Sequence, residues 1–350
     1  MGLAFETNVS LAPLTTLGLG GPARRFVRAT SEVQIIDALA SAQGEPVLLI
    51  GGGSNLVVRD GGFAGLVIQI ANTGIDIESA ADHAMVTANA GVVWDDFVAQ
   101  MVNARLSGVE CLSGIPGLVG ATPMQNVGAY GQEVSDTIDS VRVLDRAVNR
   151  ISDMLPRDCN FGYRSSIFRG SDRWVILSVR FRLPRSPKSA PIKYGELSNA
   201  LGIADGATAP LQSVRDTVIA LRRCKGMVVD ANDPASRSAG SFFTNPLVSA
   251  KQLVAVRAAV AQRLPGVTMP TFPAADDRTK LSAGWLIERA GFAKGTVRGN
   301  VGISSKHALA LVNRGGGTTA ELLALAHEIV GGVRAAFGVT LEREPILVGV

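Results

Sequence analysis

Apolar residues in the first half of the chain fall in short runs separated by glycine and polar residues. Four of these runs have the length and composition of β-strands, at residues 46–50, 65–70, 140–144 and 174–183. Residues 93–105 instead repeat apolar side chains at steps of three and four, which predicts an amphipathic helix. The first half is therefore expected to mix strand and helix, with more strand than helix.

The second half carries a stronger helical pattern. Residues 211–221 and 322–333 both repeat apolar side chains every three or four residues. Thr318 and Glu321 form a capping-box pattern ahead of the second repeat, and Gly338 predicts its C-terminal end. This half is expected to contain helices packed on a sheet.

Two further stretches are predicted to be strands of that sheet, at residues 307–313 and 339–348. The segment PRSPKSAP at 184–191 is rich in proline and serine, which is typical of a linker or surface excursion. A chain of 350 residues is long enough for about two domains. The expected division is a first domain of two α+β parts at residues 1–187, a linker and loop excursion at 188–209, and a C-terminal domain at 210–350.

Composition narrows the class of protein. Apolar residues make up 47% and charged residues 18% of the chain, which favours a globular fold over disorder. The net charge of +4 is spread without a run of Lys and Arg, so we expect no nucleic-acid partner. The 3 cysteines show no Cys-x-x-Cys spacing, so neither a disulfide framework nor a metal site is expected. The sequence shows no bilayer-length apolar stretch and no secretion signal, so we expect a cytoplasmic protein without membrane insertion.

The glycine cluster GLGGPA at residues 18–23 fits the spacing of a dinucleotide-binding fingerprint. That fingerprint requires a strand before it and a helix after it. Here Pro13 and the pair Thr15 and Thr16 precede the cluster, and residues 24–29 have the pattern of a strand. The pattern favours a turn, and a dinucleotide fold is the alternative.

A second cluster, GGGSN at residues 51–55, lies between two apolar runs with no helix after it. Its glycines permit positive φ and let backbone N–H groups converge on an anion. A third cluster, at residues 113–131, is also rich in glycine. Two such loops in one half can hold the ends of an extended pyrophosphate cofactor, although an ordinary turn is the alternative for the GGGSN cluster.

Longer motifs follow one another along nearly the whole chain. They are GGGSNL at 51–56, GIPGLVGATPMQNVGAYG at 114–131, YRSSIF at 163–168, AGSFFTNP at 239–246, SAGWLIERAG at 282–291, HALALVN at 307–313 and LEREP at 341–345. Through these segments the chain resembles the FAD-dependent UDP-N-acetylenolpyruvoylglucosamine reductases of peptidoglycan synthesis.

The resemblance implies an α+β protein with a vanillyl-alcohol-oxidase-type (PCMH-type) FAD-binding domain, not a Rossmann fold, followed by an α+β substrate-binding domain. It implies an NADPH-dependent oxidoreductase, a UDP-N-acetylmuramate dehydrogenase, in which FAD passes hydride to the enolpyruvyl group of a UDP-sugar. The expected partners are therefore small molecules, the UDP-sugar and NADPH. We expect the chain to act as a monomer in the cytoplasm.

Three residues match the family's catalytic positions. Hydride addition leaves carbanion or enol character beside the substrate carboxylate, which requires charge stabilisation and then a proton. Arg164 in YRSS can hold the carboxylate with two donors. Ser241 matches the proton donor, although the local sequence by itself favours a turn serine. Glu344 matches the catalytic glutamate, and only the resemblance separates it from Glu342, which a strand would place on the same face.

The resemblance also implies the binding residues. FAD contacts are expected at Gly51, Gly52, Gly53, Ser54, Asn55, Gly114, Ile115, Pro116, Gly117, Gly120, Ala121, Gln125, Asn126, Gly128, Ala129 and Tyr130. Substrate contacts are expected at Tyr194, Lys225 and Asn245, and also at Arg289, which stands where some members have glutamine and can add a contact to a phosphate or carboxylate. The chain departs from the common family pattern at Leu118, Arg289 and Arg343, which concerns substrate contacts more than the chemistry.

Two other functions are compatible with the same loops. An FAD oxidoreductase with this N-terminal fold can use oxygen as its acceptor, and it would be reduced by NADPH without being reoxidised by the enolpyruvyl sugar. A non-catalytic protein can bind a nucleotide sugar through glycine-rich loops, and it would be colourless after purification.

Overall fold

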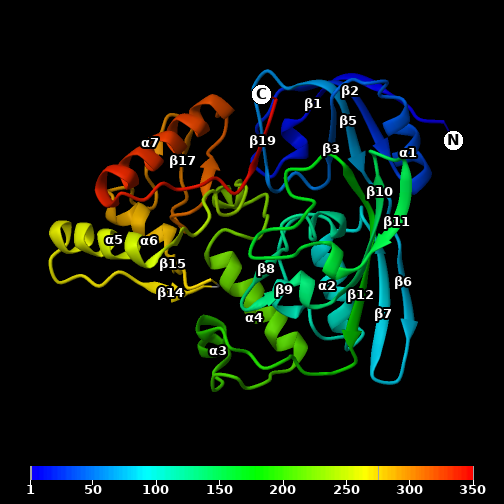
Figure 1. The fold of residues 1–350 in the computed structure, drawn as a ribbon. Coiled ribbons are helices and arrows are strands. Elements are labelled where there is room, and N and C mark those ends of the chain that lie inside the picture. The colour runs from blue at the N-terminus through cyan, green and yellow to red at the C-terminus, as the bar shows by residue number, and fades with distance from the viewer. Residues whose placement is uncertain (1, 275, 350) are drawn as a thin grey trace. The chain divides into compact units, whose positions relative to one another are not determined.

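The computed structural model describes residues 2–274 and 276–349, which fold into two compact units (Figure 1). The first unit contains the residues up to Thr7, Arg25–Gly52 and Gly65–Cys224. The second contains Asn8–Arg24, Gly53–Ala64 and the residues from Lys225 onward. Helix α4 (Leu211–Cys224) lies in the first unit, although the division expected at residue 210 assigns it to the C-terminal domain.

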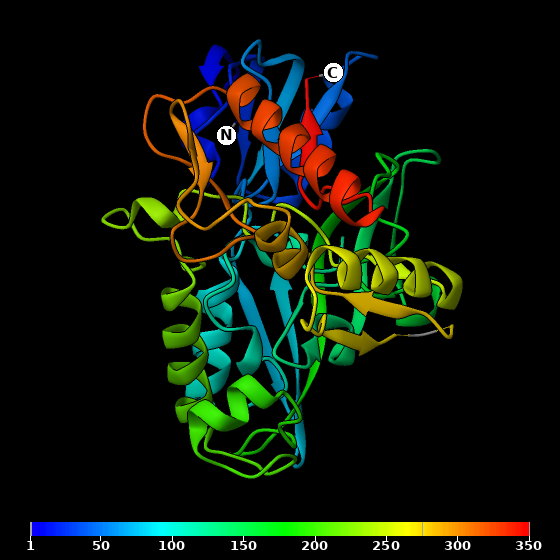
Figure 2. The same cartoon turned by 90° about the vertical axis from the view of Figure 1, so that its left-hand side faces the viewer.

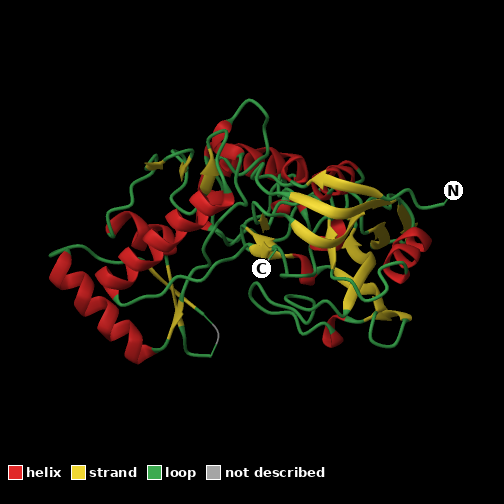
Figure 3. Cartoon of the chain, turned by 90° about the horizontal axis from the view of Figure 1, so that it is seen from above, coloured by secondary structure: helices red, strands yellow, loops and turns green. Residues whose placement is uncertain are grey.

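A five-stranded antiparallel sheet is the centre of the first unit. Its strands lie in the order β11 (Arg150–Met154), β10 (Ile138–Asp145), β12 (Trp174–Pro184), β7 (His83–Asn89) and β6 (Ile75–Ser79). Helix α2 (Trp94–Asn103) buries its apolar face on this sheet, where the rings of Phe97 and Phe181 lie 4.9 Å apart. Figure 3 shows the strands in yellow and the helices in red.

Strand β12 contains an irregularity that redirects its side chains. Its pairing with β10 shifts register at Leu177. Val175 and Leu177 belong to one hydrophobic core, whereas Val179, beyond the shift, belongs to the core under α2. The Leu177 carbonyl accepts hydrogen bonds from the Ala90 amide at 2.9 Å and from Asn72 Nδ2 at 3.0 Å. Ile176 before the shift and Val179 after it both face the core under α2, so the extra residue changes which alternate side chains of β12 face that core, and the Leu177 carbonyl ties β12 to the end of β7.

A second sheet has the order β1 (Glu6–Ser10), β2 (Pro22–Ala29), β5 (Phe63–Ile70) and β3 (Val47–Ile50), with β3 and β5 parallel. Helix α1 (Glu32–Ala40) packs against β2 and β5 in the core that includes Val175. Ser31 caps this helix by accepting a hydrogen bond from the Gln34 amide. The GGGSN segment continues directly from β3 into β4 (Leu56–Val58) with no helix between, as expected.

The rest of the first unit packs around helix α4. Leu197 of helix α3 (Gly195–Leu201) meets Val214 and Val218 of α4 in a small core. A two-residue hairpin pair, β8 (Gly128–Ala129) and β9 (Gln132–Glu133), lies in the third glycine cluster. Residues 110–112, just before the third glycine cluster, contact α2 and α4, and the short 3-10 helix at residues 119–121 within it contacts β7 and β12.

The second unit contains α5 (Ala250–Arg263), α6 (Ala283–Arg289), α7 (Thr319–Phe337) and three small sheets. The first sheet has the order β13 (Leu247–Val248), β15 (Thr279–Leu281) and β14 (Thr271–Pro273). The second has the order β16 (Val297–Arg298), β17 (Val301–Ile303) and β18 (Leu311–Asn313). The third is the parallel pair of β4 and β19 (Ile346–Val348). Helix α7 packs on β17 and β18 and contacts α5 and α6, as Figure 2 shows with α7 in orange and red.

The termini of α7 follow the sequence prediction. Thr318 and Glu321 form the capping box, and Gly338 ends the helix with a left-handed φ of 69°. The structure adds a second cap, because the Asp60 carboxylate accepts a hydrogen bond from the Thr319 amide at 2.8 Å. A residue next to β4 therefore holds the first turn of a helix near the other end of the chain.

Most predicted elements are confirmed. The strands expected at 46–50, 65–70, 140–144 and 174–183 are β3, β5, β10 and β12, and the three expected helices are α2, α4 and α7. Among the described residues, no helix has both the length and the apolar character needed to cross a membrane.

Two predicted strands are much shorter than expected. Residues 307–313 yield only β18, because the chain turns at residues 307–310, where the Ala310 amide bonds to the His307 carbonyl. Residues 339–348 yield only β19, because Pro345 has no N–H group to continue a ladder. Apolar runs alone do not reveal these turns.

Candidate active site

The two glycine-rich loops of the first unit lie against each other. A Cβ atom added to Gly52 would stand 3.1 Å from the Gly117 Cα, and one added to Gly51 would stand 3.0 Å from Leu118 Cδ1. A Cβ atom at Gly52 would therefore require the Gly117 backbone to move by a few tenths of an ångström. The two loops are therefore in contact at Gly52 and Gly117, which the sequence did not predict.

The end of β7 fixes the position of the third glycine cluster. The Gly120 amide donates to the Ala90 carbonyl at 3.0 Å, and the Trp94 amide donates to the Gly117 carbonyl at 3.0 Å. A Cβ atom on Gly120 would stand 2.5 Å from the Ala90 Cβ. The Ala90 amide also binds the Leu177 carbonyl, at the register shift of β12. The central sheet therefore fixes the position of Ala90, and Ala90 in turn fixes the position of Gly120.

Asp95 in α2 binds the same loop at its first glycine, Gly114. Its carboxylate accepts the Gly114 amide at 2.6 Å and a two-pronged hydrogen bond from Arg215 of α4, at 2.6 and 2.9 Å. Burial alone would raise the pKa of Asp95, but these hydrogen bonds outweigh it and hold the pKa below its ordinary value. Asp95 thus stays ionised and fastens the loop to two helices.

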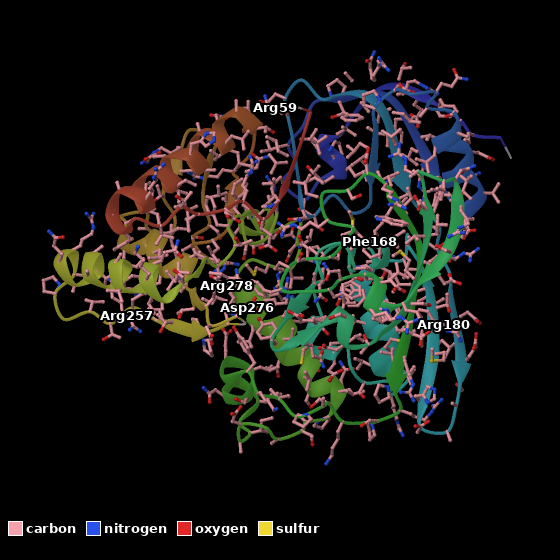
Figure 4. All side chains as sticks on the ribbon, viewed as in Figure 1. Arg59, Phe168, Arg180, Arg257, Asp276 and Arg278 are labelled. Atoms are coloured by element: carbon pink, nitrogen blue, oxygen red, sulfur yellow. The ribbon has the colours of Figure 1, made fainter. Side chains whose placement is uncertain are left out.

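Arg164 is attached to the far end of this cluster. Its guanidinium donates to the Gly128 carbonyl at 2.6 Å, and it lies over the Tyr163 ring at 5.2 Å. Asn126, with a left-handed φ of 45°, donates to the Gly162 carbonyl at 3.2 Å. The YRSSIF segment ends at Phe168, which is 1% exposed and anchors the segment inside the first unit (Figure 4). The structure therefore brings Arg164 together with the predicted flavin residues.

Tyr130 and Tyr194 form an aromatic pair with ring centroids 5.4 Å apart and an angle of 80° between the rings. Burial raises the pKa of Tyr130 to about 12, despite the nearby Arg222 guanidinium, which acts to lower it. Tyr130 also lines a cavity of about 580 Å³ whose far wall includes Ile192 and Lys193 of the predicted excursion. Tyr194, in the predicted excursion, therefore contacts Tyr130 of the predicted flavin loop.

In the second unit, Ser241 and Glu344 lie on adjacent extended segments. The Glu344 amide donates to the carbonyl of Phe242, the residue after Ser241, at 3.0 Å. Glu342 pairs one step further away, with its carbonyl accepting the Thr244 amide at 3.0 Å. Glu342 is exposed whereas Glu344 is half-buried, so the two glutamates that the sequence could not separate have different surroundings.

The second part of the GGGSN loop belongs to this same unit. A Cβ atom on Gly53, whose φ is 58°, would stand 1.9 Å from the Leu14 carbonyl oxygen. The Asn55 carbonyl accepts the Ile346 amide at 2.9 Å, two residues beyond Glu344. The segment at residues 344–346 therefore binds both Asn55, through the Ile346 amide, and Phe242, through the Glu344 amide.

The predicted substrate residues have varied surroundings. Lys225 is half-buried just after α4. Asn245 accepts the Ala283 amide through Oδ1 at 3.0 Å, so it supports the start of α6. Arg289, in the last turn of α6, is exposed and lies 5.9 Å over the Trp285 ring. The structural role of Asn245 is additional to its predicted role and was not visible in the sequence.

The predicted site residues are thus divided between the two units. Arg164, Tyr130, Tyr194 and the glycine loops up to Gly52 and from Gly114 onward are in the first. Ser241, Glu344, Lys225, Asn245, Arg289 and residues 53–55 are in the second. Sequence reasoning missed the supporting residues Asp95 and Asn72, because an acidic residue at a helix start and a loop asparagine give no separate signal.

The first group fits a flavin nucleotide. At Gly52 and Gly117 the two backbones approach closely with no side chain at either position, and glycine-rich backbone of this kind suits a pyrophosphate. Beside them, Tyr130 and Tyr194 provide aromatic surface and Arg164 provides a fixed positive charge.

Comparisons with known proteins agree on one family. A model of an FAD-binding domain matches residues 23–151, and a model of the UDP-N-acetylenolpyruvoylglucosamine reductase C-terminal domain matches residues 233–348. The chain is 53% identical to the UDP-N-acetylenolpyruvoylglucosamine reductase of Thermobifida fusca, covering 100% of this chain and 99% of that protein. It is 51% identical to the enzyme of the same name from Streptomyces coelicolor, covering 97% and 89%. The crystal structure of the Thermus caldophilus enzyme matches with a TM-score of 0.68 and 25% identity, covering 100% of both chains.

Proposed function

The chain belongs to the UDP-N-acetylenolpyruvoylglucosamine reductase family, and from this premise we propose how its own residues carry the reaction. It is an FAD-dependent oxidoreductase that reduces UDP-N-acetylglucosamine enolpyruvate to UDP-N-acetylmuramate, a precursor of peptidoglycan. The predicted α+β fold with a flavin domain is confirmed. FAD supplies the chemistry of accepting a hydride from NADPH and passing it to the enolpyruvyl double bond.

The FAD is held by the glycine-rich loops. Backbone amides in residues 51–55, and those of Ile115 and Gly117, would approach the pyrophosphate, with Gly114 fastened to Asp95 and with Pro116, Gly120, Ala121 and Gln125 beside them. Asn126 and residues 128–130 form the wall against the flavin. The support for this assignment is the contact between Gly52 and Gly117, which places two amide-rich segments together.

Arg164 binds the substrate carboxylate. Its guanidinium donates to the Gly128 carbonyl at 2.6 Å, and its planar fork of N–H donors matches the geometry of a carboxylate. Hydride arrives at the terminal carbon of the enolpyruvyl group, and negative charge then develops on the carboxylate. A permanent cation at this point stabilises that charge at any working pH.

Ser241 donates the proton that completes the reduction. Its O–H bond breaks as a C–H bond forms at the carbon that carries the carboxylate, and the serine oxygen recovers a proton from solvent. Glu344 helps stabilise the intermediate. The observation that carries this assignment is the hydrogen bond from the Glu344 amide to the Phe242 carbonyl, next to Ser241.

The uridine diphosphate portion is bound by Lys225, Tyr194, Asn245 and Arg289. Lysine and arginine provide positive charge for the diphosphate, and tyrosine provides a flat apolar surface with a polar tip. Arg289 is exposed at the end of α6, which is consistent with a contact to a charged group in solution.

The test separates the two half-reactions under anaerobic conditions. Wild-type protein should bleach with NADPH and regain its colour with UDP-N-acetylglucosamine enolpyruvate. Ser241→Ala should bleach normally and regain its colour far more slowly. Equal reoxidation of the wild-type and Ser241→Ala proteins would remove the proton-donor role.

A matched pair of variants tests the choice of glutamate. Glu344→Gln should slow reoxidation by the enolpyruvyl sugar, whereas Glu342→Gln should leave it unchanged, because Glu342 is exposed and pairs further from Ser241. The reverse result would assign the catalytic glutamate to position 342.

We also propose that the enzyme works as a monomer in the cytoplasm, on small molecules alone. Sedimentation equilibrium of the FAD-loaded protein should give the mass of one chain over a wide concentration range. A mass that rises toward two chains would contradict this.

A further inference from the structure

The turn that contains Thr15, Thr16 and the GLGGPA cluster has no part in the function described so far. It does not bind a dinucleotide in the manner of a Rossmann fold, because residues after it form β2 and no helix follows. Within the second unit, however, Thr16 contacts two segments that the proposed reaction requires. One is the GGGSN loop, and the other leads to Ser241.

Thr16 makes these contacts with different groups. Its backbone amide donates to the Gly53 carbonyl at 3.3 Å, and its hydroxyl donates to the Ser238 carbonyl at 2.6 Å. Only Ala239 and Gly240 separate Ser238 from Ser241, and Gly240 has a φ of 70°. The Ser238 carbonyl therefore marks the start of the bend that presents Ser241.

These bonds close a circuit through the second unit. From Gly53 the chain leads to Asn55, whose carbonyl binds the Ile346 amide, and from Ile346 back to Glu344. The Glu344 amide binds the Phe242 carbonyl, and the chain returns through Ser241 to Ser238 and Thr16. The Thr16 hydroxyl is the side-chain member of this circuit, since the other three bonds join backbone groups.

The turn itself is held in place from two further sides. The Thr15 hydroxyl donates to the Leu19 carbonyl at 3.0 Å within the turn. The buried Asn313 donates through Nδ2 to the Leu17 carbonyl at 3.0 Å. Thr16 therefore projects from a turn whose own position is fixed, which is what a residue needs to position another segment.

We propose that Thr16 is a positioning residue for Ser241, acting through the Ser238 carbonyl. This inference rests on the proton-donor role proposed for Ser241. Loss of the Thr16 hydroxyl removes one of the hydrogen bonds that hold the start of the serine bend, beside its pairing with Val312, and the Ser241 hydroxyl is then aligned less often with the carbon that receives the proton. The hydrogen bond from the Thr16 amide to the Gly53 carbonyl does not involve the side chain, so the variant retains it. The GGGSN loop therefore keeps this support, and we expect reduction of the flavin to be unaffected.

The variants Thr16→Val and Thr16→Ser test this in the FAD-loaded, full-length protein. Thr16→Val keeps the shape and removes the hydroxyl, and we expect anaerobic reoxidation by UDP-N-acetylglucosamine enolpyruvate to slow about 10-fold. Flavin reduction by NADPH should be unchanged, and the slowing of reoxidation in D₂O should increase, since proton transfer becomes more rate-limiting. Thr16→Ser should restore the wild-type rate. If Thr16→Val fails to fold, Thr16→Ala provides the same loss of hydroxyl.

Thr296→Val is the matched control, because it removes a threonine hydroxyl that donates to the Ala293 carbonyl at 2.7 Å in the second unit, without touching the turn or Ser238. It should lower thermal stability and leave the reoxidation rate unchanged. Wild-type reoxidation in Thr16→Val, or equal slowing of both half-reactions, would overturn the inference.

Ser241→Ala distinguishes failure of this inference from failure of the proposed function. Slow reoxidation in Ser241→Ala with normal reoxidation in Thr16→Val refutes only the role of Thr16. Normal reoxidation in Ser241→Ala refutes the proton donor and the inference together. If both hold, the double variant should be no slower than Ser241→Ala alone.

Discussion

At the scale of single residues, Arg164 combines an unfavourable backbone with a firmly held side chain. Its φ of 51° lies in the left-handed region, which costs a non-glycine residue about 1 kcal/mol. The surrounding hydrogen bonds maintain it, including one from Arg169 to the Arg164 carbonyl at 2.7 Å. The backbone conformation and these hydrogen bonds thus fix the direction of the Arg164 side chain, so a shorter or non-planar cation at this position has little freedom to reach the same partners.

Arg164→Lys should therefore lower turnover although the charge is retained. A lysine ammonium cannot bind Gly128 and a carboxylate with the geometry of a planar guanidinium. We expect reoxidation by the enolpyruvyl sugar to fall roughly 10-fold to 100-fold, with flavin reduction by NADPH unchanged. Stopped-flow absorbance measures both rates, and an unaltered reoxidation rate would contradict the carboxylate role.

Gly120 offers a prediction about the cofactor loop. In Gly120→Ala the new methyl would stand 2.5 Å from the Ala90 Cβ, so the loop must move away from β7. Overpacking of this kind costs about 1 to 3 kcal/mol, and we expect weaker FAD retention as well as a lower unfolding midpoint. Gly195→Ala, at a helix start with no atom within 4 Å of the added Cβ, is the control and should be neutral. Equal behaviour of the two variants would exclude crowding as the cause.

At the scale of elements, the contact between Asp95 and Arg215 joins α2, α4 and the third glycine cluster. The pKa of Asp95 is lowered, so its contribution to stability is complete above the ordinary carboxyl pKa of about 4 and is lost as the pH falls through the lowered value. Asp95→Asn keeps an acceptor for Gly114 but removes the charge opposite Arg215, which is largely buried. We expect a loss of about 1 to 2 kcal/mol near neutral pH.

Denaturant unfolding of the wild-type and Asp95→Asn proteins at two pH values measures this directly. The difference in unfolding free energy should be present at pH 7 and should shrink below about pH 4, where the wild-type carboxylate becomes protonated. A difference that stays constant with pH would show that Asp95 acts through shape instead of charge.

Elements with a local signal could be predicted, and those that depend on distant partners could not. The periodicity and capping box of α7 lie within its own sequence, so its limits at Thr318 and Gly338 were predictable. The register shift at Leu177 was not, because it depends on Asn72 and Ala90, whose positions come from other strands. The glycine loops were predictable as loops, whereas their contact depends on the whole sheet.

At the scale of the whole molecule, the second unit combines segments from both ends of the sequence. Residues 8–24 and 53–64 pack with the residues after Lys225, and the linear division expected from composition shifts does not describe this arrangement. A proline-rich stretch reveals where a chain leaves a domain, but no local pattern reveals that an earlier segment has joined a later one. Asn313, which binds the Leu17 carbonyl, illustrates such a contact.

Asp60 provides a test of this exchanged architecture. Its carboxylate accepts amides at the start of α7, so Asp60→Ala removes a cap supplied from outside the helix. We expect a loss of about 1 kcal/mol in stability. Hydrogen exchange should rise in the first turn of α7 and in β19, with no change in the five-stranded sheet of the first unit. Uniform exchange across both units would contradict the independence of their cores.

Strand β19 is synthesised after nearly everything it packs with, whereas its parallel partner β4 is among the first elements to be made. Until residue 346 has been added, β4 has no partner in that sheet and Asn55 has no Ile346 amide to bind. Pairings between such distant segments form slowly and leave strand edges open in the meantime. A ribosome stalled just before residue 346 therefore holds a nascent chain with every residue of the first unit, and with Glu344 not yet fastened to the loop at Asn55.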